Sequence, residues 1–371
     1  MIPQITIPYA VADFAEIRER GFYYVDKTRF IPYLERYKAP VFLRPRRFGK
    51  TLNMSMLECF FSNKYANRAD LFEGLSIWQE EAYRKLQGSY PVIFLSFAAV
   101  KAGNLEDAKT QIKQEIARLY RENRNLMKED IFGEDERELY YQTTVKMDDV
   151  TAQDSLRNLS EWMERYYGKK VIILLDEYDT PMQEAYVQGY WDEFTAFVRS
   201  LFNASFKTNP YLERAIMTGI TRVSKESIFS DLNNLQVITT TSDLYADCFG
   251  FTESEVFHVL DEFGMGDKKD EVKQWYDGYD LKGIQIYNPR SVVMSLSGHD
   301  FDSYWTKTET YEALKKYIQM DMYNLKELVT RLIAGSSIEI NPDKFQNDMT
   351  TFASADDVLT LLVHLGYLTY D

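Results

Sequence analysis

This chain carries the stretch Arg44-Pro45-Arg46-Arg47-Phe48-Gly49-Lys50-Thr51, whose last three residues complete the phosphate-loop (Walker A) pattern GxxxxGK(S/T). An apolar run at residues 40–43 precedes the stretch, and an amphipathic run at residues 52–61 follows it. A strand before the loop and a helix after it are the context that this pattern requires. Taken alone, Gly-Lys-Thr is better explained as a chance tripeptide at a helix start, so a second motif is needed.

Each residue type in this stretch suits a phosphate contact. Backbone N–H groups of the loop and helix start can wrap a β-phosphate, and Gly49 lets the main chain come close. We expect Lys50 to neutralise β- and γ-phosphate oxygens and the Thr51 hydroxyl to bind Mg²⁺. Arg44 replaces the first glycine of the pattern, and Pro45 is expected to set an alternative entry into the loop. The predicted phosphate-loop contacts are Arg44, Pro45, Arg46, Arg47, Phe48, Gly49, Lys50, Thr51 and Leu52.

The second motif is an apolar run at residues 171–175, followed directly by Asp176 and Glu177. Open α/β sheets place their ligands at the carboxyl ends of strands, where this acidic pair falls. We expect Asp176 to hold Mg²⁺, directly or through water, and Glu177 to orient and deprotonate the attacking water. An isolated acidic pair is more often a helix cap. Two motifs in this order favour a P-loop nucleoside triphosphatase that uses Mg²⁺.

A further apolar run ends in polar residues that could reach the same site. The hydroxyls of Thr218 and Thr221 could sense the γ-phosphate or position water, and Thr218 is a predicted nucleotide contact. Arg222 could stabilise transition-state charge as an arginine finger does. The alternative, in which Thr221 caps a helix and Arg222 is a surface charge, has equal support. The predicted catalytic residues are Glu177, Lys50 and Arg222.

Other charged residues near the loop have two interpretations. Arg46 and Arg47 could contact phosphate or a neighbouring subunit, whereas a single arginine in such a loop is often just solvated. Asp26 and Lys27 precede the first strand and could frame a pocket for the base. A helix cap and an ion pair explain these two residues almost as well.

The whole pattern predicts an α/β fold with a P-loop three-layer αβα core and a mainly parallel sheet. Its strands are expected at four continuous apolar runs, which is typical of parallel strands covered on both faces: 40–43, 91–97, 171–175 and 214–219. Core helices are expected at 51–61, 105–123, 152–167 and 192–206. Later short helices are expected at 252–263, 267–276, 310–319 and 324–334. We therefore predict a P-loop core over residues 1–250 and a mostly helical lid over residues 251–371.

Composition limits the possible partners. The 371 residues include 57 acidic and 43 basic side chains, and the formal charge of −14 disfavours a general nucleic-acid binder. The two cysteines, at 59 and 248, lie far apart and predict neither a disulfide framework nor a zinc site. No apolar run approaches the length of a membrane span and no signal peptide opens the sequence, so we expect a cytoplasmic protein without membrane contact. The apolar, strand-like run at residues 365–371 leads us to expect a truncated carboxyl terminus.

Taken together, the motifs resemble the AAA-ATPase-like family of bacterial P-loop proteins, which is related to AAA+ and STAND-type ATPases. The residues that carry the resemblance are Tyr24-Val25-Asp26-Lys27-Thr28, the loop from Arg44 to Thr51, Leu175-Asp176-Glu177-Tyr178-Asp179-Thr180-Pro181, Thr218-Gly219-Ile220-Thr221-Arg222, Trp275-Tyr276-Asp277-Gly278-Tyr279 and Tyr287-Asn288-Pro289. The resemblance implies ATP as the nucleotide, an arginine-rich loop without its first glycine, and a helical or winged-helix-like region after the core. Many relatives continue into a nuclease-like domain of the PD-(D/E)XK type. That domain is absent from this sequence, so nucleic-acid contact is expected only through a domain not present here.

Two functions remain open from the sequence. In the first, ATP binding and hydrolysis drive a conformational switch that a protein partner or a second copy of the chain detects. In the second, the chain is a nucleotide-dependent interaction module with negligible turnover in isolation. A small-molecule kinase would need a base placed on its acceptor, and the sequence offers no recognisable one. A nucleic-acid motor conflicts with the net charge and the lack of helicase motifs.

Overall fold

The computed structural model describes residues 6–128, 130–221, 235–304, 324–342, 345 and 354–370. Within them, the core is a sheet of five parallel strands in the order β2-β3-β4-β1-β5. The strands are β1 (Ala39–Leu43), β2 (Val92–Ser96), β3 (Val171–Asp176), β4 (Leu212–Gly219) and β5 (Leu235–Ile238). Four of these strands match the predicted runs. The short β5 was not predicted.

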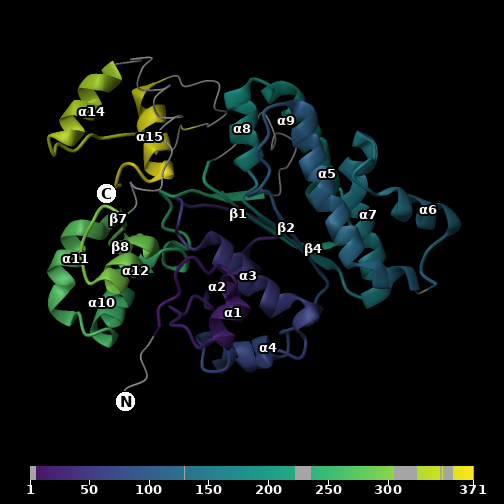
Figure 1. The fold of residues 1–371 in the computed structure, drawn as a ribbon, viewed down its shortest axis with the longest axis horizontal. Coiled ribbons are helices and arrows are strands. Elements are labelled where there is room, and N and C mark those ends of the chain that lie inside the picture. The colour runs from purple at the N-terminus through teal and green to yellow at the C-terminus, as the bar shows by residue number, and fades with distance from the viewer. Residues whose placement is uncertain are drawn as a thin grey trace.

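Both faces of this sheet are covered by helices, as the continuous apolar runs predicted. Strand residues alternate between two cores, so Val41 and Leu43 belong to one core while Phe42 belongs to the other. The first core includes α5 (Leu105–Glu122), α7 (Asp149–Tyr167) and α9 (Trp191–Phe202), and the second includes α1 (Phe14–Glu19), α2 (Phe30–Tyr33) and α3 (Lys50–Phe61). Figure 1 shows the two helical layers above and below the sheet. The predicted three-layer αβα core is confirmed.

The helices of the core begin where the sequence supplies a cap. The Asn104 side chain accepts a hydrogen bond from Asp107 N at the start of α5, and Asp148 accepts one from Thr151 N at the start of α7. Such caps satisfy backbone N–H groups that have no partner within the helix. The remaining core helices are α4 (Glu81–Arg84), α6 (Glu134–Gln142) and α8 (Thr180–Gln188), and a π-helical turn over Asn203–Lys207 extends α9.

The chain after the core combines short helices with a second sheet. Its helices are α10 (Glu253–Glu262), α11 (Lys269–Tyr276) and α12 (Pro289–Gly298), which lie together at the left of Figure 1. Its antiparallel sheet has the order β6-β8-β7, with β6 (Phe251–Thr252), β7 (Asp277–Leu281) and β8 (Ile284–Tyr287). The β7–β8 hairpin was not predicted, because these strands are short and mix polar with apolar residues. The boundary at residue 250 stays a prediction.

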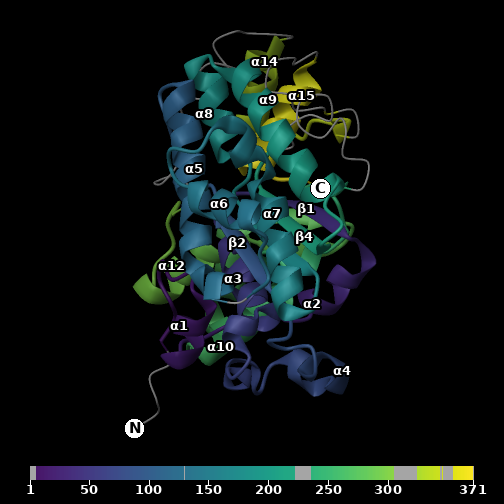
Figure 2. The same cartoon turned by 90° about the vertical axis from the view of Figure 1, so that its right-hand side faces the viewer.

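Two further helices complete the described chain, namely α14 (Leu325–Ile333) and α15 (Ala355–Leu365). They share an apolar cluster, against which Tyr186 of α8 packs. Figure 2 accordingly shows α14 and α15 near α8 and α9. The helix predicted at 310–319 lies outside the described residues. No helix of the described chain is both long enough and apolar enough to cross a membrane.

The order of strands determines which motifs meet. Strand β4 lies between β1 and β3, with Leu43 of β1 paired to Gly219 and Leu175 of β3 paired to Met217. The phosphate-loop strand and the strand ending in Asp176 are therefore separated by one strand, although their carboxyl ends share one edge of the sheet. Loops at this edge form the ligand side of open parallel sheets.

Candidate functional site

The phosphate loop joins β1 to α3 through two residues in the left-handed backbone region, Arg47 (φ 66°) and Gly49 (φ 78°). Gly49 is the N-cap residue of α3, and its carbonyl accepts a hydrogen bond from Asn53 N at 2.9 Å. Apart from Phe48, Lys50 and the backbone of α3, no described heavy atom lies within 4 Å of the place where a Cβ at residue 49 would stand. The backbone angle, rather than crowding, therefore favours glycine here, and the helix start stays open to an anion.

The Lys50 ammonium lies inside this loop. Its side chain is only 3% exposed, and Nζ donates hydrogen bonds to the carbonyls of Arg44 (3.2 Å) and Pro45 (3.1 Å). The same atom lies 3.6 Å from Oε1 of Glu177, which belongs to the second motif. The lysine thus links the two predicted motifs directly.

The Asp176 carboxylate receives one hydroxyl from each neighbouring motif. Thr51 Oγ1 donates to Asp176 Oδ2 at 2.8 Å, and the Thr218 hydroxyl donates to Oδ1. Burial raises the pKa of Asp176 above its ordinary value, although these two hydrogen bonds and the Lys50 charge oppose the shift. Two hydroxyls and a cation thereby partly compensate a fully buried carboxylate.

Glu177 takes an uncommon conformation for a residue with a side chain, with φ 53°. Its Oε2 accepts a hydrogen bond from Thr180 Oγ1 at 3.4 Å, while Oε1 faces Lys50. The Glu177 side chain is 21% exposed. It therefore reaches the rim of the site instead of being buried beneath it.

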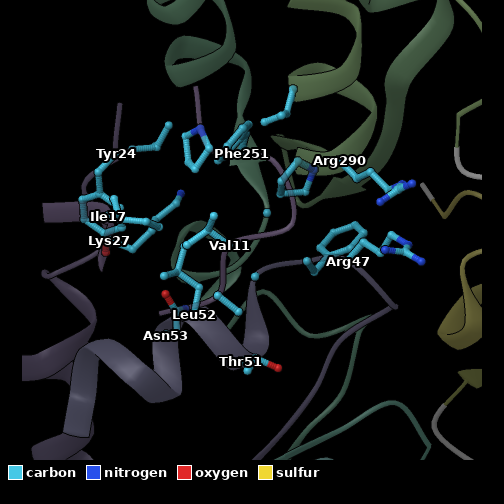
Figure 3. A pocket seen from close by; sticks show the side chains of 18 of the residues that line it. Val11, Ile17, Tyr24, Lys27, Arg47, Thr51, Leu52, Asn53, Phe251 and Arg290 are labelled. Atoms are coloured by element: carbon cyan, nitrogen blue, oxygen red, sulfur yellow. The ribbon is translucent and has the colours of Figure 1, made fainter. Parts of the chain in front are cut away.

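A cavity of about 440 Å³ opens directly beside the loop. Its wall combines residues 47–53 with residues 7–12 of the amino-terminal segment and with Phe251, Pro289 and Arg290 from the second part of the chain. Figure 3 shows Val11, Tyr24, Leu52 and Phe251 around this space, with Thr51 at its lower edge. Small-molecule sites commonly have this size and a mainly apolar lining with a few polar groups.

The two residues with an open interpretation before β1 have separate positions. Lys27 lines the cavity, and its Nζ donates to Glu255 Oε2 at 2.6 Å and to the Asp247 carbonyl at 2.8 Å. Asp26 instead accepts hydrogen bonds from the backbone N–H groups of Thr28 (2.9 Å) and Ser76 (2.7 Å). Lys27 therefore ties the cavity wall to α10, whereas Asp26 joins two loops.

Arg44 differs from the other predicted loop residues. Its guanidinium donates to the carbonyls of Leu43 (2.9 Å), Thr239 (2.7 Å) and Leu244 (3.1 Å), and burial lowers its pKa to about 10. The Arg44 side chain is thus committed to backbone carbonyls between β1 and the segment after β5. These hydrogen bonds hold the loop against the segment after β5, and no phosphate contact is proposed for the Arg44 side chain.

The remaining predicted site residues differ in burial, and one of them is not described. Phe48 is buried, with its ring 5.5 Å from that of Tyr279 at an interplanar angle of 81°. Leu52 lines the cavity, Pro45 is buried, Arg46 is half-buried and Arg47 is exposed. Arg222 lies outside the described residues, so its role stays a prediction.

Sequence reasoning quoted Asp179 within a family motif but gave it no role, and the structure shows it fully buried beside the site. Its Oδ2 accepts hydrogen bonds from Ile220 N (2.9 Å), Thr221 N (2.7 Å) and Thr221 Oγ1 (2.7 Å). The hydroxyl of Thr221 is therefore directed at this carboxylate. The available signal was an acidic residue in the turn that directly follows Asp176 and Glu177.

The class of protein follows from this site together with the family comparison. A model of the AAA-ATPase-like family, described as a predicted AAA-ATPase, matches residues 8–229, and the chain belongs to this family. The family expected from the motifs is thereby confirmed.

One relative extends the comparison beyond these residues. The chain is 30% identical over 310 residues to a protein of Azotobacter chroococcum mcd 1 described as an uncharacterized protein in the vnfD 5′ region. This match covers 82% of the chain and 54% of the relative. The chain thus spans about half the length of the relative it matches.

Proposed function

We propose that this chain binds ATP with Mg²⁺ and hydrolyses it. The observation that supports this most directly is the meeting of the two motifs, with Thr51 Oγ1 at 2.8 Å from Asp176 Oδ2 and Lys50 Nζ at 3.6 Å from Glu177 Oε1. A phosphate-binding lysine, two oxygen donors for a hard cation and a partly exposed carboxylate then face one small volume.

The residues present fit a magnesium nucleotide. Gly49 opens the loop at the start of α3, where backbone N–H groups favour an anion. The oxygens of Thr51 and Asp176 are hard ligands of the kind Mg²⁺ prefers, and they are already joined by a hydrogen bond. The adjoining cavity of about 440 Å³ offers mainly apolar contacts to a base and sugar.

The chain's own groups would divide the chemistry among them. Mg²⁺, when bound by Thr51 and Asp176, would neutralise phosphate charge. The Lys50 ammonium would leave the carbonyls of Arg44 and Pro45 and bind phosphate oxygens instead. Glu177 would orient water and accept its proton at a carboxylate oxygen. Thr218 would hold Asp176 in place, and Arg222 remains the candidate for stabilising charge at the γ-phosphate.

A nucleotide in this cavity would contact both parts of the chain. Residues 47–53 belong to the core, whereas Pro289 and Arg290 open α12 beyond the small sheet. A ligand shifts a conformational equilibrium only when its affinity for the two states differs. The cavity wall shared by both parts of the chain supplies a physical basis for such a difference in affinity. We therefore propose a nucleotide-driven switch whose state is detected by a protein partner or a second copy of the chain.

A Glu177→Gln variant tests the hydrolysis proposal. Loss of the general base should lower kcat by about 10²- to 10⁴-fold while nucleotide affinity is retained. Phosphate release and nucleotide binding should be measured on the same preparation. If the wild-type chain is no faster than the variant although both bind ATP, the second function, a nucleotide-dependent interaction module, replaces the first.

A further inference from the structure

We propose that Asp179 is a positioning residue for the proposed hydrolysis, holding the turn that carries Glu177 against the end of β4. The inference rests on the proposed function and deepens it. Asp179 would touch neither nucleotide nor water. It would act through Glu177 and through the backbone that follows Gly219.

The Asp179 carboxyl group accepts hydrogen bonds from several donors in the segment directly after β4. Its Oδ2 accepts from both backbone N–H groups of Ile220 and Thr221 and from the Thr221 hydroxyl, at 2.7 to 2.9 Å. Ile220 and Thr221 follow the last residue of β4, so their buried backbone N–H groups need an acceptor other than a neighbouring strand. One oxygen atom therefore fixes the backbone direction after β4.

Tyr178 adds a second set of contacts between the same two segments. Its N–H donates to the Thr218 carbonyl at 3.0 Å, and its hydroxyl donates to the Thr221 carbonyl at 2.8 Å. A Cβ at Gly219 would lie 2.6 Å from Asp179 Oδ1 and 2.6 Å from Cε1 of Tyr178. Glycine at this position is what allows the turn to approach the strand so closely.

Glu177 lies between the two anchored ends of this turn. On one side Asp176 is held by the hydroxyls of Thr51 and Thr218, and on the other side Asp179 is held by the end of β4. A left-handed conformation such as φ 53° at Glu177 persists only where the surroundings impose it. The contacts of Asp179 supply that constraint, and they direct the Glu177 carboxylate toward Lys50.

A hydrogen-bonded link that served only the fold would not require a buried carboxyl group with an unpartnered oxygen. Asp179 is fully buried, its Oδ1 has no hydrogen-bond partner among the described residues, and burial raises its pKa. A buried carboxyl with an unpartnered oxygen lowers stability. We take this cost as a sign that the Asp179 carboxyl group serves catalysis through the placement of Glu177.

Three variants separate positioning from simple support of the fold. Asp179→Ala removes every hydrogen bond of the Asp179 carboxyl group to Ile220 and Thr221, whereas Asp179→Asn keeps one acceptor oxygen for the two N–H groups. Gln183→Ala is the control, because its amide donates to the same Oδ2 at 3.0 Å and to Thr221 Oγ1 at 3.4 Å, and its loss leaves the three hydrogen bonds from Ile220 and Thr221 to Asp179 in place. For each variant, kcat should be measured at saturating nucleotide and expressed per nucleotide-binding site.

The alanine variant should lose about 10²-fold in kcat, because displacing a catalytic group by a fraction of an ångström to an ångström has effects of this size. The asparagine variant should lose about tenfold, the Gln183→Ala control should keep wild-type kcat, and the nucleotide dissociation constant should stay within about threefold in all three. Partial rescue by asparagine with unchanged binding is the signature of positioning.

Other outcomes overturn the inference. Wild-type kcat in the alanine variant, or in the asparagine variant should alanine not fold, would show that Glu177 does not depend on Asp179. Loss of nucleotide binding in parallel with kcat would make Asp179 a structural residue only. Failure of the proposed function looks different, because the wild-type chain itself would then show no turnover, and the inference would fall with it.

Discussion

The Thr51 hydroxyl donates a hydrogen bond of 2.8 Å to Asp176 Oδ2 across 125 positions of sequence. These residues follow β1 and end β3, two strands that are not neighbours in the sheet. The intervening β4 contributes Thr218, whose hydroxyl binds the other oxygen of the same carboxylate. Side chains from α3 and β4 therefore converge on Asp176 at the end of β3, and Asp176 is the buried acid that we propose as a Mg²⁺ ligand.

Replacing the Thr51 hydroxyl should weaken the magnesium dependence of nucleotide binding. In Thr51→Val one of the two proposed oxygen ligands is lost, so Mg²⁺ should enhance ATP affinity less than it does in the wild type. Affinity should be measured by calorimetry with Mg²⁺ and with a chelator. Thr195→Val is the matched control, because that buried hydroxyl donates only to the Trp191 carbonyl within α9. A full magnesium effect in Thr51→Val would exclude Thr51 as a ligand.

Arg44→Gly should destabilise the chain, although it restores the glycine of the phosphate-loop pattern. The Thr239 and Leu244 carbonyls would lose the hydrogen bonds of this buried guanidinium, each worth about 1.5–3 kcal/mol for a charged donor, although the Thr239 carbonyl keeps one from Ser242 N. Arg47→Gly is the contrast, because an exposed residue with φ 66° suits glycine and should lower the unfolding temperature much less. Equal unfolding temperatures for Arg44→Gly and the wild type would contradict the structural position of the Arg44 guanidinium.

Phe48→Ala should destabilise the contact between the phosphate loop and the second sheet. The Phe48 ring packs against Tyr279 and Ile286, and the Tyr279 hydroxyl donates to the Val363 carbonyl of α15 at 3.1 Å. Removing a buried phenylalanine side chain costs about 3–5 kcal/mol. Phe48→Leu keeps most of the apolar volume and should lose less, as measured by denaturant unfolding. Equal losses in the two variants would show that the ring is not packed as described.

The Glu136–Arg165 pair should make stability acid-sensitive. Hydrogen bonds from Arg165 lower the pKa of Glu136 from 4.5 to about 2, against the opposing effect of burial. A carboxyl with a lowered pKa stabilises the fold above its unfolded pKa, and that contribution is lost as the pH falls through the folded pKa. The difference in unfolding free energy between wild type and Glu136→Gln should therefore shrink from about pH 4.5 to about pH 2.

The control for this pH dependence is Gln142→Ala, which changes an exposed, non-ionisable residue of the same helix. Its difference from the wild type should stay nearly constant over the same range. A Glu136→Gln difference that is also constant with pH would mean that the ion pair contributes nothing to acid stability.

Local sequence patterns were sufficient to predict most elements of the core. The four predicted strands are found because each is buried on both faces, which leaves a continuous apolar run such as residues 171–175. The phosphate loop and Asp176 could be predicted for a similar reason, since their chemistry lies in short contiguous motifs. The hairpin of β7 and β8 could not, because it is half-covered and its polar residues hide the alternation.

The parts of the site that escaped prediction depend on contacts between distant segments. Arg44 was expected to contact phosphate, yet its partners Thr239 and Leu244 lie about two hundred positions later. Asp179 binds Ile220 and Thr221 more than forty positions away. Nothing in the local sequence states which strand will lie beside another, and that order determines both sets of contacts.

Nucleotide-induced stabilisation tests the central claim most directly. At a ligand concentration of about 100 times the dissociation constant, binding should add about 2.7 kcal/mol, which raises the unfolding temperature by several degrees. We expect this rise with Mg-ATP in the wild type and in the surface control Lys85→Ala, and its loss in Lys50→Ala. An undiminished rise in Lys50→Ala, or no rise in the wild type, would contradict a nucleotide site built around Lys50.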